Sequence, residues 1–525
     1  MSAGELEQSF RFTTPRPRAT ISAASGWSVS RAQLFGFVAV YCAANALLRW
    51  TVSETAGIDD VDQILRAQIW NLGYGPQPPL YTWLTKLFLG AFGYNVLSML
   101  LLKELIIFSI YAVIYAAAHR LTGSHLHAVL ATVLLQANFS IAWEAHRELT
   151  HTVLLSALAA ATVWAFIGLE RDRWRPYLVL GICSGLGMLA KYNFALVWLA
   201  LFLAALSLRD LRPLLFNRKM LVALLLMVAL CAPHFIWVAR HPVLAFSSVP
   251  KLKMATPGDW SSVAQALGKW IMAILAHAGP MVALVALAFV PEMIQRSGGQ
   301  ASLPVKRRFE LARGADLFPS TFQQQLLVRT LLFILILVTA NIIIFRVTGV
   351  RDRYVQPFFV WLPVLLVGAL PRKITARAVR FFLPLAGLGA VVVALVAPGR
   401  ILLTESLKKN EILNTPFRKL AMDLKSAVER ADCIVAENHR VAGNLRLWFP
   451  TKLVLDPEVA PLFQPAHRKT LLVWESNSNA QPPTELLRFV RSFNEAAKMD
   501  ESRTVEELLK YHHVRTIRLG VALVE

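Results

Sequence analysis

The chain has 525 residues, of which 56% are hydrophobic and 17% charged, with a formal net charge of +21 and a mean hydropathy of +0.49. This composition is too apolar for a soluble chain of that length, so it excludes a water-soluble enzyme or binding domain. The basic excess does not indicate nucleic-acid binding, because Lys and Arg fall mostly in short stretches between apolar runs, as topology signals do. We therefore expect a polytopic α-helical membrane protein whose general partner is membrane lipid.

The first 31 residues are basic and too long for a cleavable signal peptide, so we expect them to stay in the cytoplasm. The apolar runs that follow are continuous rather than alternating, which favours spanning helices of roughly 20 residues over a barrel. About eleven spans are predicted, near residues 32–50, 96–118, 125–143, 150–169, 176–190, 192–207, 219–239, 266–290, 327–346, 357–370 and 379–397. This odd number, with more basic residues in the inner loops, places the C-terminal tail outside.

The first predicted outer loop contains the stretch GIDDVDQILRAQIWNLGYGPQPPLYTWL at residues 57–84. Asp59, Asp60 and Asp62 are typical of a helix start, and Asp62 has the i, i+4 spacing to Arg66 of a helix ion pair. Capping explains the acids but not the length of the loop. Its apolar residues favour amphipathic helices that lie in the membrane interface.

Further polar segments are expected on the same outer face. They are EAHRELTH (144–151), the hinge at Lys191, residues 240–260 and RVTGVRDRYVQP (346–357). Lys103 and Glu104 interrupt the apolar run after Asn95. We expect the second span to begin near residue 104 with Lys103 at the outer interface, in preference to a buried ion pair.

The stretch DDVDQILRAQIWNLGYGPQPPLYTWL resembles the first outer loop of bacterial glycosyltransferase family 39, the dolichyl-phosphate-mannose protein mannosyltransferases and their aminoarabinose-transferase relatives in the GT-C superfamily. In that motif an acidic pair opens an interfacial helix, and Gly-Tyr and then Pro-Pro-Leu follow. Further stretches agree in order over roughly the first 370 residues: RELTHTVLLSAL (147–158), GICSGLGMLAKYNFALVWLAL (181–201), PHFIWVARHPVLAF (233–246) and RDRYVQP (351–357).

The resemblance implies a GT-C fold and transfer of a sugar from a polyprenyl-phosphate donor to an acceptor hydroxyl at the periplasmic face of the bacterial inner membrane. It implies that Asp59 is the catalytic base and that Asp60 shapes the local field or takes part in binding. A positioned base contributes roughly 10²–10⁴-fold, and the phosphate that leaves needs cations. The candidates for binding that phosphate are Lys191, Arg351, Arg353 and Tyr354, with Lys86, Lys103 and Arg147 behind them.

Glu148, His151 and Asp62 are candidates for an acceptor site or a metal site. Glu148 and His151 can share a helix face, but no DxD pattern occurs there, and Mg²⁺ prefers oxygen ligands. No cofactor is certain: a divalent metal stays open, and we expect none to be obligatory. The residues do not identify the sugar, nor whether the acceptor is an envelope glycolipid such as lipopolysaccharide, a polysaccharide or a protein.

The tail alternates helix-like and strand-like segments and predicts a small periplasmic α/β domain. The expected division is a cytoplasmic segment 1–31, a transmembrane domain 32–397 that includes the first outer loop 51–94, and a C-terminal domain 398–525. Two other classes stay open. A transporter or flippase of lipid-linked sugars would show inverted repeats and helices broken at the midplane, and a scaffold would need no acidic loop. The gathering of polar residues in outer loops favours the transferase.

Overall fold

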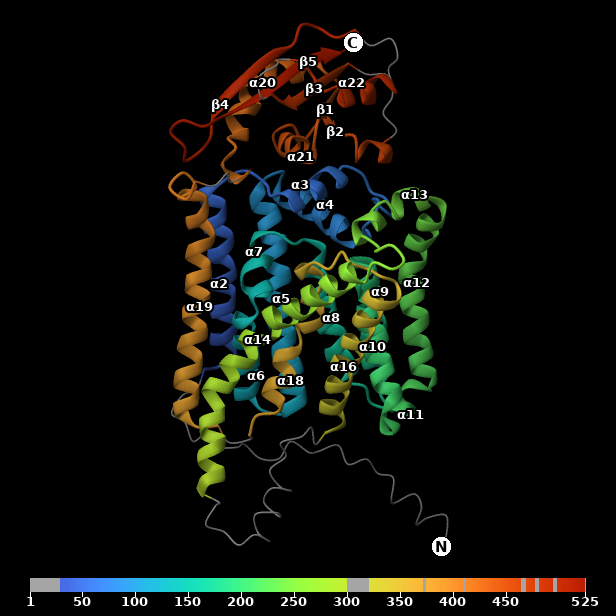
Figure 1. Cartoon of the computed structure of the whole chain (residues 1–525), viewed down its shortest axis with the longest axis vertical. Helices are drawn as coiled ribbons and strands as arrows, with labels where there is room; N and C mark the ends of the chain where they lie inside the picture. Colours follow the sequence, from blue (N-terminus) through green and yellow to red (C-terminus); the bar gives the residue numbers. More distant parts are fainter. Residues whose placement is uncertain are drawn as a thin grey trace.

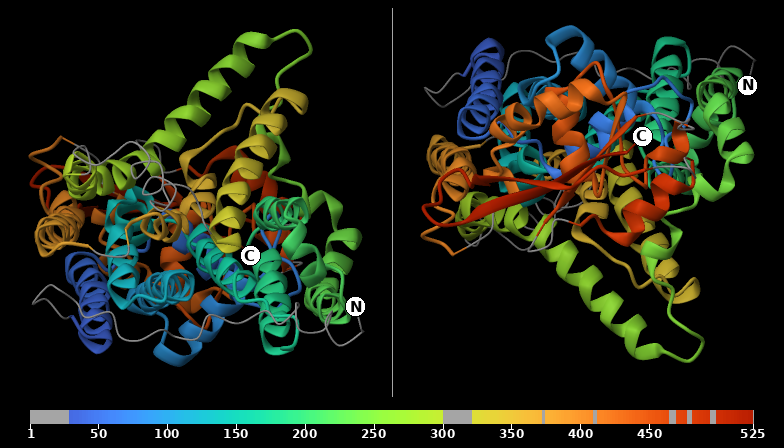
Figure 2. Two further views of the ribbon diagram at one scale, coloured as in Figure 1. Left: turned by 90° about the horizontal axis from the view of Figure 1, so that it is seen from below. Right: turned by 90° about the horizontal axis from the view of Figure 1, so that it is seen from above.

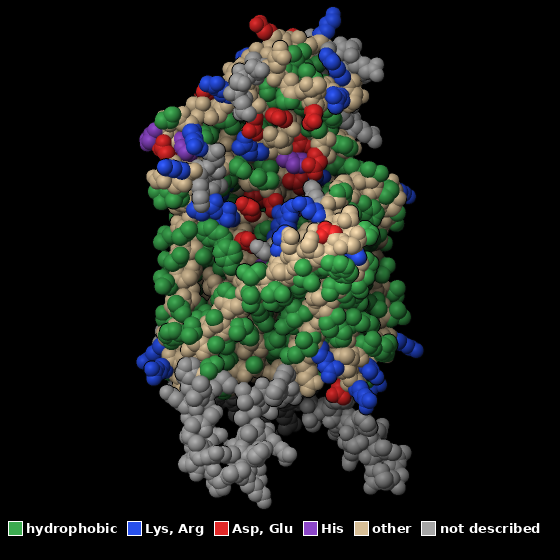
Figure 3. Space-filling view, viewed as in Figure 1, with side chains coloured by type: hydrophobic (Ala, Val, Ile, Leu, Met, Phe, Trp, Pro, Cys, Tyr) green, Lys and Arg blue, Asp and Glu red, His purple; other side chains and the backbone are tan. Residues whose placement is uncertain are grey.

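The computed structural model describes residues 29–299, 321–371, 374–408, 412–463, 469–476, 481–493 and 498–524. A bundle of apolar helices forms its larger part, and a small α/β layer covers one pole of the bundle (Figure 1). Hydrophobic side chains form a band around the bundle, and charged side chains gather between this band and the α/β layer (Figure 3). Residues 1–28 of the predicted cytoplasmic segment lie outside the described residues.

Six described helices are long and apolar enough to cross a membrane. They are α2 (Arg31–Val52), α5 (Val96–Thr122), α12 (Arg218–Arg240), α14 (Trp260–Gly299), α16 (Phe322–Ile344) and α19 (Ala376–Leu402). Seen along the bundle axis, α14 runs obliquely, and one half of it stands apart from the other helices (Figure 2). The protein is therefore a multi-pass membrane protein, as its composition predicts.

Two further predicted spans are bent helix pairs, which raise the number of described spans to eight if each pair is counted as one. The first pair joins α6 (His125–Leu134) and η1 (Leu135–Ala137) to η2 (Ser140–Glu144) and α7 (Ala145–Arg147) with a bend of 73°. The second joins α10 (Phe194–Ser207) to η3 (Arg209–Leu211) and α11 (Arg212–Leu215) with a bend of 106°.

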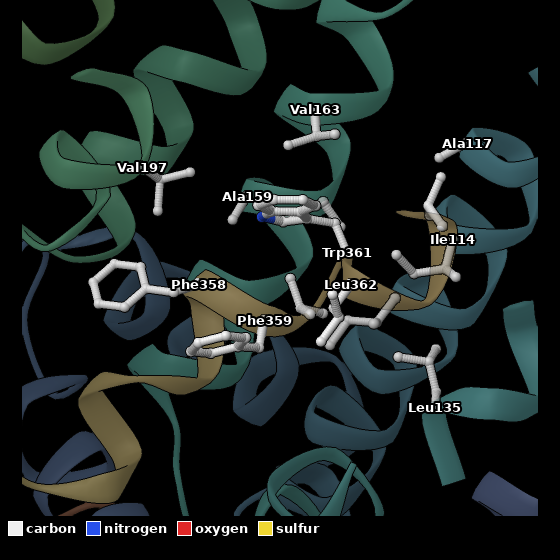
Figure 4. Packing of buried hydrophobic residues seen from close by; sticks show 14 of the residues in the cluster. Ile114, Ala117, Leu135, Ala159, Val163, Val197, Phe358, Phe359, Trp361 and Leu362 are labelled. Atoms are coloured by element: carbon white, nitrogen blue, oxygen red, sulfur yellow. The ribbon is translucent and has the colours of Figure 1, made fainter. Parts of the chain in front are cut away.

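The remaining predicted spans coincide with shorter apolar helices. These are α8 (His151–Phe166), α9 (Arg175–Ala190) and the pair α17 (Gln356–Phe359) and α18 (Leu362–Gly368). Each of the eleven predicted segments is thus helical, while the number that cross the membrane stays a prediction. The short pair is packed inside the bundle: Trp361 and Phe359 are each 1% exposed and lie among side chains of α5, α8 and α10 (Figure 4).

The expected start of the second span near residue 104 is wrong. Helix α5 begins at Val96, where the Asn95 side chain accepts a hydrogen bond from the Ser98 N–H and caps the helix. Lys103 lies within the second turn after this start and is 1% exposed, because the outer helices cover it. A buried ion pair, the less favoured alternative, is what the chain forms at this point.

The first outer loop contains two helices, α3 (Ile58–Arg66) and α4 (Leu80–Phe92), that lie between the bundle and the α/β layer (Figure 1). The predicted pair in α3 is confirmed, with Arg66 Nε 2.8 Å from Asp62 Oδ1. Shorter turns α13 (Pro242–Ala245), η4 (Val249–Leu252) and η5 (Asp352–Tyr354) complete this pole. The Lys253 carbonyl accepts the Thr348 N–H at 2.8 Å, so segments 240–260 and 346–357 are hydrogen-bonded to each other.

The C-terminal layer has a five-stranded sheet in the order β2-β1-β3-β5-β4, preceded by η6 (Ile412–Asn414). The strands are β1 (Cys433–Ala436), β2 (Leu453–Leu455), β3 (Thr470–Glu475), β4 (Arg503–Leu508) and β5 (Thr516–Val524). The helices are α20 (Phe417–Arg430), α21 (His439–Trp448), η7 (Ala460–Leu462) and α22 (Thr484–Arg491). The predicted α/β character is confirmed; β4 was not predicted, and β1 pairs in parallel with both β2 and β3.

The C-terminal layer is packed directly on α3. Leu65 is fully buried in the apolar core of that layer, and Gly443 of α21 meets Val61 so closely that an added Cβ would lie 2.4 Å from the Val61 Cβ. The Gln68 side chain donates to the Val454 carbonyl at 2.7 Å and accepts the Val454 N–H at 3.0 Å. It thereby continues the edge of β2, and the helix that carries the aspartates is held by two layers at once.

Candidate active site

Asp59 and Asp60 lie in the first turn of α3, which begins after Gly57. Carboxylates are favourable there because the helix dipole is positive at its N-terminal end. Asp59 Oδ2 accepts a hydrogen bond from the Leu149 N–H at 3.1 Å, and Arg353 Nη1 lies 3.9 Å from Asp59 Oδ1. The Asp59 side chain keeps 28% of its surface exposed, so it can receive a ligand.

The backbone that contacts Asp59 is unusual. Leu149 has φ of 63°, a left-handed conformation that non-glycine residues adopt rarely. It follows the single π-helical turn at Ser140–Glu144, and such turns occur often at functional sites. The two irregularities turn the chain between α7 and α8 so that a backbone N–H points at the carboxylate of Asp59.

Asp60 has a different environment from its neighbour. Lys103 Nζ lies 3.1 Å from Asp60 Oδ1, and the two side chains are 1% and 7% exposed. The next residue of α5, Glu104, pairs with His146 Nδ1 at 2.7 Å and is equally buried. Adjacent residues of one helix therefore anchor α3 on one side and the turn that leads to Leu149 on the other.

Lys191 lies in the break between α9 and α10, as the sequence predicts. Its Nζ donates to Thr152 Oγ1 at 2.8 Å and lies 5.0 Å from the centre of the Tyr354 ring. Arg353 lies 5.8 Å from the same ring centre. Burial, and then the positive charge of Arg353, lower the pKa of Lys191 to about 8, although Asp59 opposes the shift. Tyr354 thus keeps two cations together beside the base candidate.

The structure brings Asp59, Arg353, Tyr354 and Lys191 together and places the other cation candidates differently. Arg351 is exposed. Lys103 is bound to Asp60, and Arg147 lies 3.3 Å from Glu148 and 5.2 Å from the Trp143 ring centre. Lys86 donates to the carbonyls of Ala67 and Gln68 at 2.9 Å each. These carbonyls follow the last turn of α3, so Lys86 caps the end of the helix opposite to Asp59.

The three candidates for an acceptor or metal site each contact a different partner. Glu148 is 59% exposed beside Arg147, whereas His151 is buried with its Nδ1 3.1 Å from the Ala190 carbonyl oxygen. Asp62 is bound to Arg66. Among the residues that the structure describes, no group of three or more His, Cys, Asp or Glu side chains could hold a metal ion.

Asp62 belongs to an ionic contact between α3 and the C-terminal layer. His439, the first residue of α21, contacts Asp456 through Nδ1, while its Nε2 lies 3.0 Å from Glu458 Oε2 and 3.7 Å from Asp62 Oδ1. Burial opposes the protonation of His439, but hydrogen bonds to Asp456 and Glu458 outweigh it and raise its pKa to about 10. The imidazolium therefore joins three carboxylates at the junction.

Three features of this site were not predicted: the Leu149 N–H, the pair of Glu104 with His146, and the junction at His439. The first is a backbone group in an irregular turn and leaves no signature in residue type. The second had a signal, because two adjacent charges inside an apolar run usually have partners in the bundle.

The described residues thus form a multi-pass helical bundle with an acidic outer loop, cations beside it and a small α/β layer above it. Residues 76–237 match the family described as dolichyl-phosphate-mannose-protein mannosyltransferase. The predicted resemblance to this glycosyltransferase family is therefore confirmed.

Two curated relatives match over most of their length. The lipopolysaccharide core galacturonosyltransferase RgtB of Rhizobium johnstonii is 29% identical over 464 residues, covering 86% of this chain and 89% of RgtB. RgtA from the same organism, also a lipopolysaccharide core galacturonosyltransferase, is 25% identical over 452 residues, covering 84% of this chain and 86% of RgtA. The crystal structure of ArnT from Cupriavidus metallidurans bound to undecaprenyl phosphate has a TM-score of 0.53 at 14% identity, covering 94% of this chain and 98% of ArnT. The likeness to ArnT shows a shared fold.

Proposed function

We propose that the chain transfers a sugar from a polyprenyl-phosphate donor to a hydroxyl of an envelope glycolipid, with Asp59 as the base. The position of the Asp59 carboxylate carries this proposal. One of its oxygens accepts the Leu149 N–H at 3.1 Å, and Arg353 lies 3.9 Å from the other. A partly exposed carboxylate next to a cation supplies the two groups that such a transfer requires.

In the proposed step the acceptor oxygen attacks the anomeric carbon and forms the new glycosidic bond. The bond between that carbon and the phosphate oxygen breaks, and polyprenyl phosphate leaves with the electron pair. Asp59 takes the proton of the acceptor hydroxyl. Arg353 and Lys191 stabilise the charge that develops on the phosphate, and Arg353 is suited to bidentate contact. A single displacement of this kind inverts the configuration at the anomeric carbon.

The two curated relatives support a galacturonosyl donor and a lipopolysaccharide core acceptor for this chain. A galacturonosyl phosphate carries a carboxylate as well as a phosphate, so its binding site needs more than one cation. Arg353 and Lys191 share the Tyr354 ring, and the exposed Arg351 lies two residues before Arg353. We propose that this group binds both anionic parts of the donor.

The proposed compartment follows from charge. Basic residues predominate in the loops at the pole opposite to the C-terminal layer, and such loops stay in the cytoplasm of inner-membrane proteins. We therefore propose that Asp59 and the C-terminal layer face the periplasm, where lipopolysaccharide core would be reached.

The experiment that tests the function uses the purified chain in lipid nanodiscs with lipopolysaccharide core as acceptor. The donors are polyprenyl-phosphate galacturonic acid and the same carrier with neutral galactose. The base variant is Asp59→Asn, and the matched control is Glu54→Gln in the same loop. Glu54 is exposed and lies 3.5 Å from Arg418 in a surface pair, which contributes only about 0–1 kcal/mol.

We expect transfer from the galacturonosyl donor, a loss of kcat of at least about 10²-fold in Asp59→Asn, and unchanged activity in Glu54→Gln. Equal activity of Asp59→Asn and the native chain would overturn the assignment of the base. Transfer of neutral galactose at an equal rate would overturn the donor assignment while keeping the reaction class. Movement of the intact donor between leaflets without transfer would instead identify a flippase.

A further inference from the structure

A pocket that contains two arginines lies at the opposite pole of the bundle from Asp59. It has a volume of about 440 Å³ and is lined by Arg31, Phe35, Tyr115, His119, Arg120 and Trp164, which come from α2, α5 and α8. The other end of α2 is held at the C-terminal layer, because the Val52 carbonyl accepts hydrogen bonds from Lys510 and Tyr511. A helix of this length spans about 33 Å, so the pocket lies at the far edge of the apolar band.

Two arginines are held on aromatic rings in this pocket. Arg31 Nε donates to Tyr115 Oη at 3.3 Å, and its guanidinium lies 5.4 Å from that ring centre. Arg120 Nη1 donates to the Trp164 carbonyl at 2.7 Å and lies 4.5 Å from the Trp164 ring centre. Within the described ranges of the chain, neither arginine has a carboxylate within 4.0 Å, and Glu170 nearby is paired with Arg173 at 3.0 Å.

Neighbouring residues leave space for Arg120 and hold the tyrosine that contacts Arg31. At Gly168, just after α8, an added Cβ would lie 2.1 Å from Arg120 Nη1, so a larger residue there would displace this guanidinium from its present position. His125 Nε2 donates to the Val29 carbonyl at 2.7 Å, and its Nδ1 lies 2.7 Å from Tyr115 Oη. It thereby fixes the tyrosine on which Arg31 lies. Arginines that only set the orientation of the chain in the membrane would need neither the space beside Gly168 nor these hydrogen bonds.

The position and chemistry of the pocket indicate its ligand. Two guanidinium groups without carboxylate partners favour a phosphate, which they can contact bidentately. Basic pockets between spanning helices at a membrane surface typically hold the head groups of anionic lipids. Phe35 and the exposed apolar residues Phe37 and Val40 of α2 would lie beside the acyl chains. We propose that this pocket binds the phosphate of an anionic glycerophospholipid from the leaflet opposite to the active site.

The test is native mass spectrometry of the full chain after delipidation and titration with phosphatidylglycerol or phosphatidylethanolamine. The pocket variants are Arg31→Gln/Arg120→Gln and, as an independent disruption, Gly168→Ala. The matched control is Arg173→Gln/Arg218→Gln, which removes the same charge at the same pole outside the pocket. Inorganic phosphate is added to the native chain in a competition arm.

We expect the native chain to prefer the anionic lipid, and Arg31→Gln/Arg120→Gln to bind it about 10- to 30-fold more weakly, as the loss of two arginine contacts predicts. Gly168→Ala, which displaces Arg120 alone, should weaken binding by a smaller factor. The control should bind like the native chain. Equal binding of the two lipids, or an equal loss in the control, would overturn the site. Full displacement by millimolar inorganic phosphate would overturn the lipid assignment and identify a free-phosphate site. The lipid preference is measured on the native chain itself, so the proposal can be refuted even if a variant misfolds.

Discussion

The buried pair of Lys103 and Asp60 gives the sharpest prediction about stability. The two charged atoms are 3.1 Å apart, and the side chains are 1% and 7% exposed. Replacing Lys103 with Met leaves the Asp60 carboxylate buried without its cation. Removing one partner of a buried pair typically costs about 3–5 kcal/mol, because the remaining charge has lost both water and partner.

The measurement is the free energy of unfolding in mixed micelles, titrated with a denaturing detergent. The control is Arg418→Met, which removes a cation from the exposed pair with Glu54 at 3.5 Å and should cost about 0–1 kcal/mol. The double variant Lys103→Met/Asp60→Leu removes both charges and should recover most of the stability, since burying apolar groups in place of an ion pair is often neutral. A cost for Lys103→Met no larger than that of the control would refute the reasoning.

Three further predictions concern the junction and the site. Gly443→Ala should speed tryptic release of the C-terminal layer, because the added Cβ would lie 2.4 Å from the Val61 Cβ; the same change at Gly268, which has no atom within 4 Å of such a Cβ, should not. The pKa of Lys191 is lowered to about 8, so the KM for the donor should rise as the pH passes from about 7 to about 9 and the lysine loses its charge. Lys191→Arg should abolish this rise. A flat profile in the native chain would contradict the assigned role. His439, whose pKa is raised to about 10, contributes stability that is complete below its unfolded pKa of about 6.5 and is lost as the pH rises to about 10. The difference in unfolding free energy between the native chain and His439→Gln should therefore shrink over this window, and a constant difference would contradict the ionic junction.

Much of the fold follows from residue patterns. Apolar runs must be helical in a membrane, because an unpaired backbone group has no water to bind there, and each of the eleven predicted segments is helical. The alternation of patterns in the tail likewise predicted its α/β character. The expected gathering of Asp59, Lys191 and Arg353 is also observed, since outer loops of one bundle share one surface.

The tertiary structure decided which of the two adjacent aspartates stays partly exposed. Asp59 and Asp60 are neighbours of the same residue type, and successive residues of a helix point about 100° apart. Asp60 thereby faces α5 and meets Lys103, whereas Asp59 faces Arg353. Which side chain is buried depends on how α5 packs against α3, and no local pattern encodes that.

The sequence by itself determined that this protein lies in a membrane, where its helices are and which kinds of residue gather at its outer face. These features depend on composition and on spacing along the chain. Only the tertiary structure decided the burial of Lys103, the left-handed turn at Leu149 and the contact of α21 with α3. Each of these joins segments far apart in the sequence, and Asn444 of α21, which accepts the Ala56 N–H at 2.8 Å, is separated from it by 388 positions. Such contacts depend on the geometry of packing, which residue types constrain but do not specify.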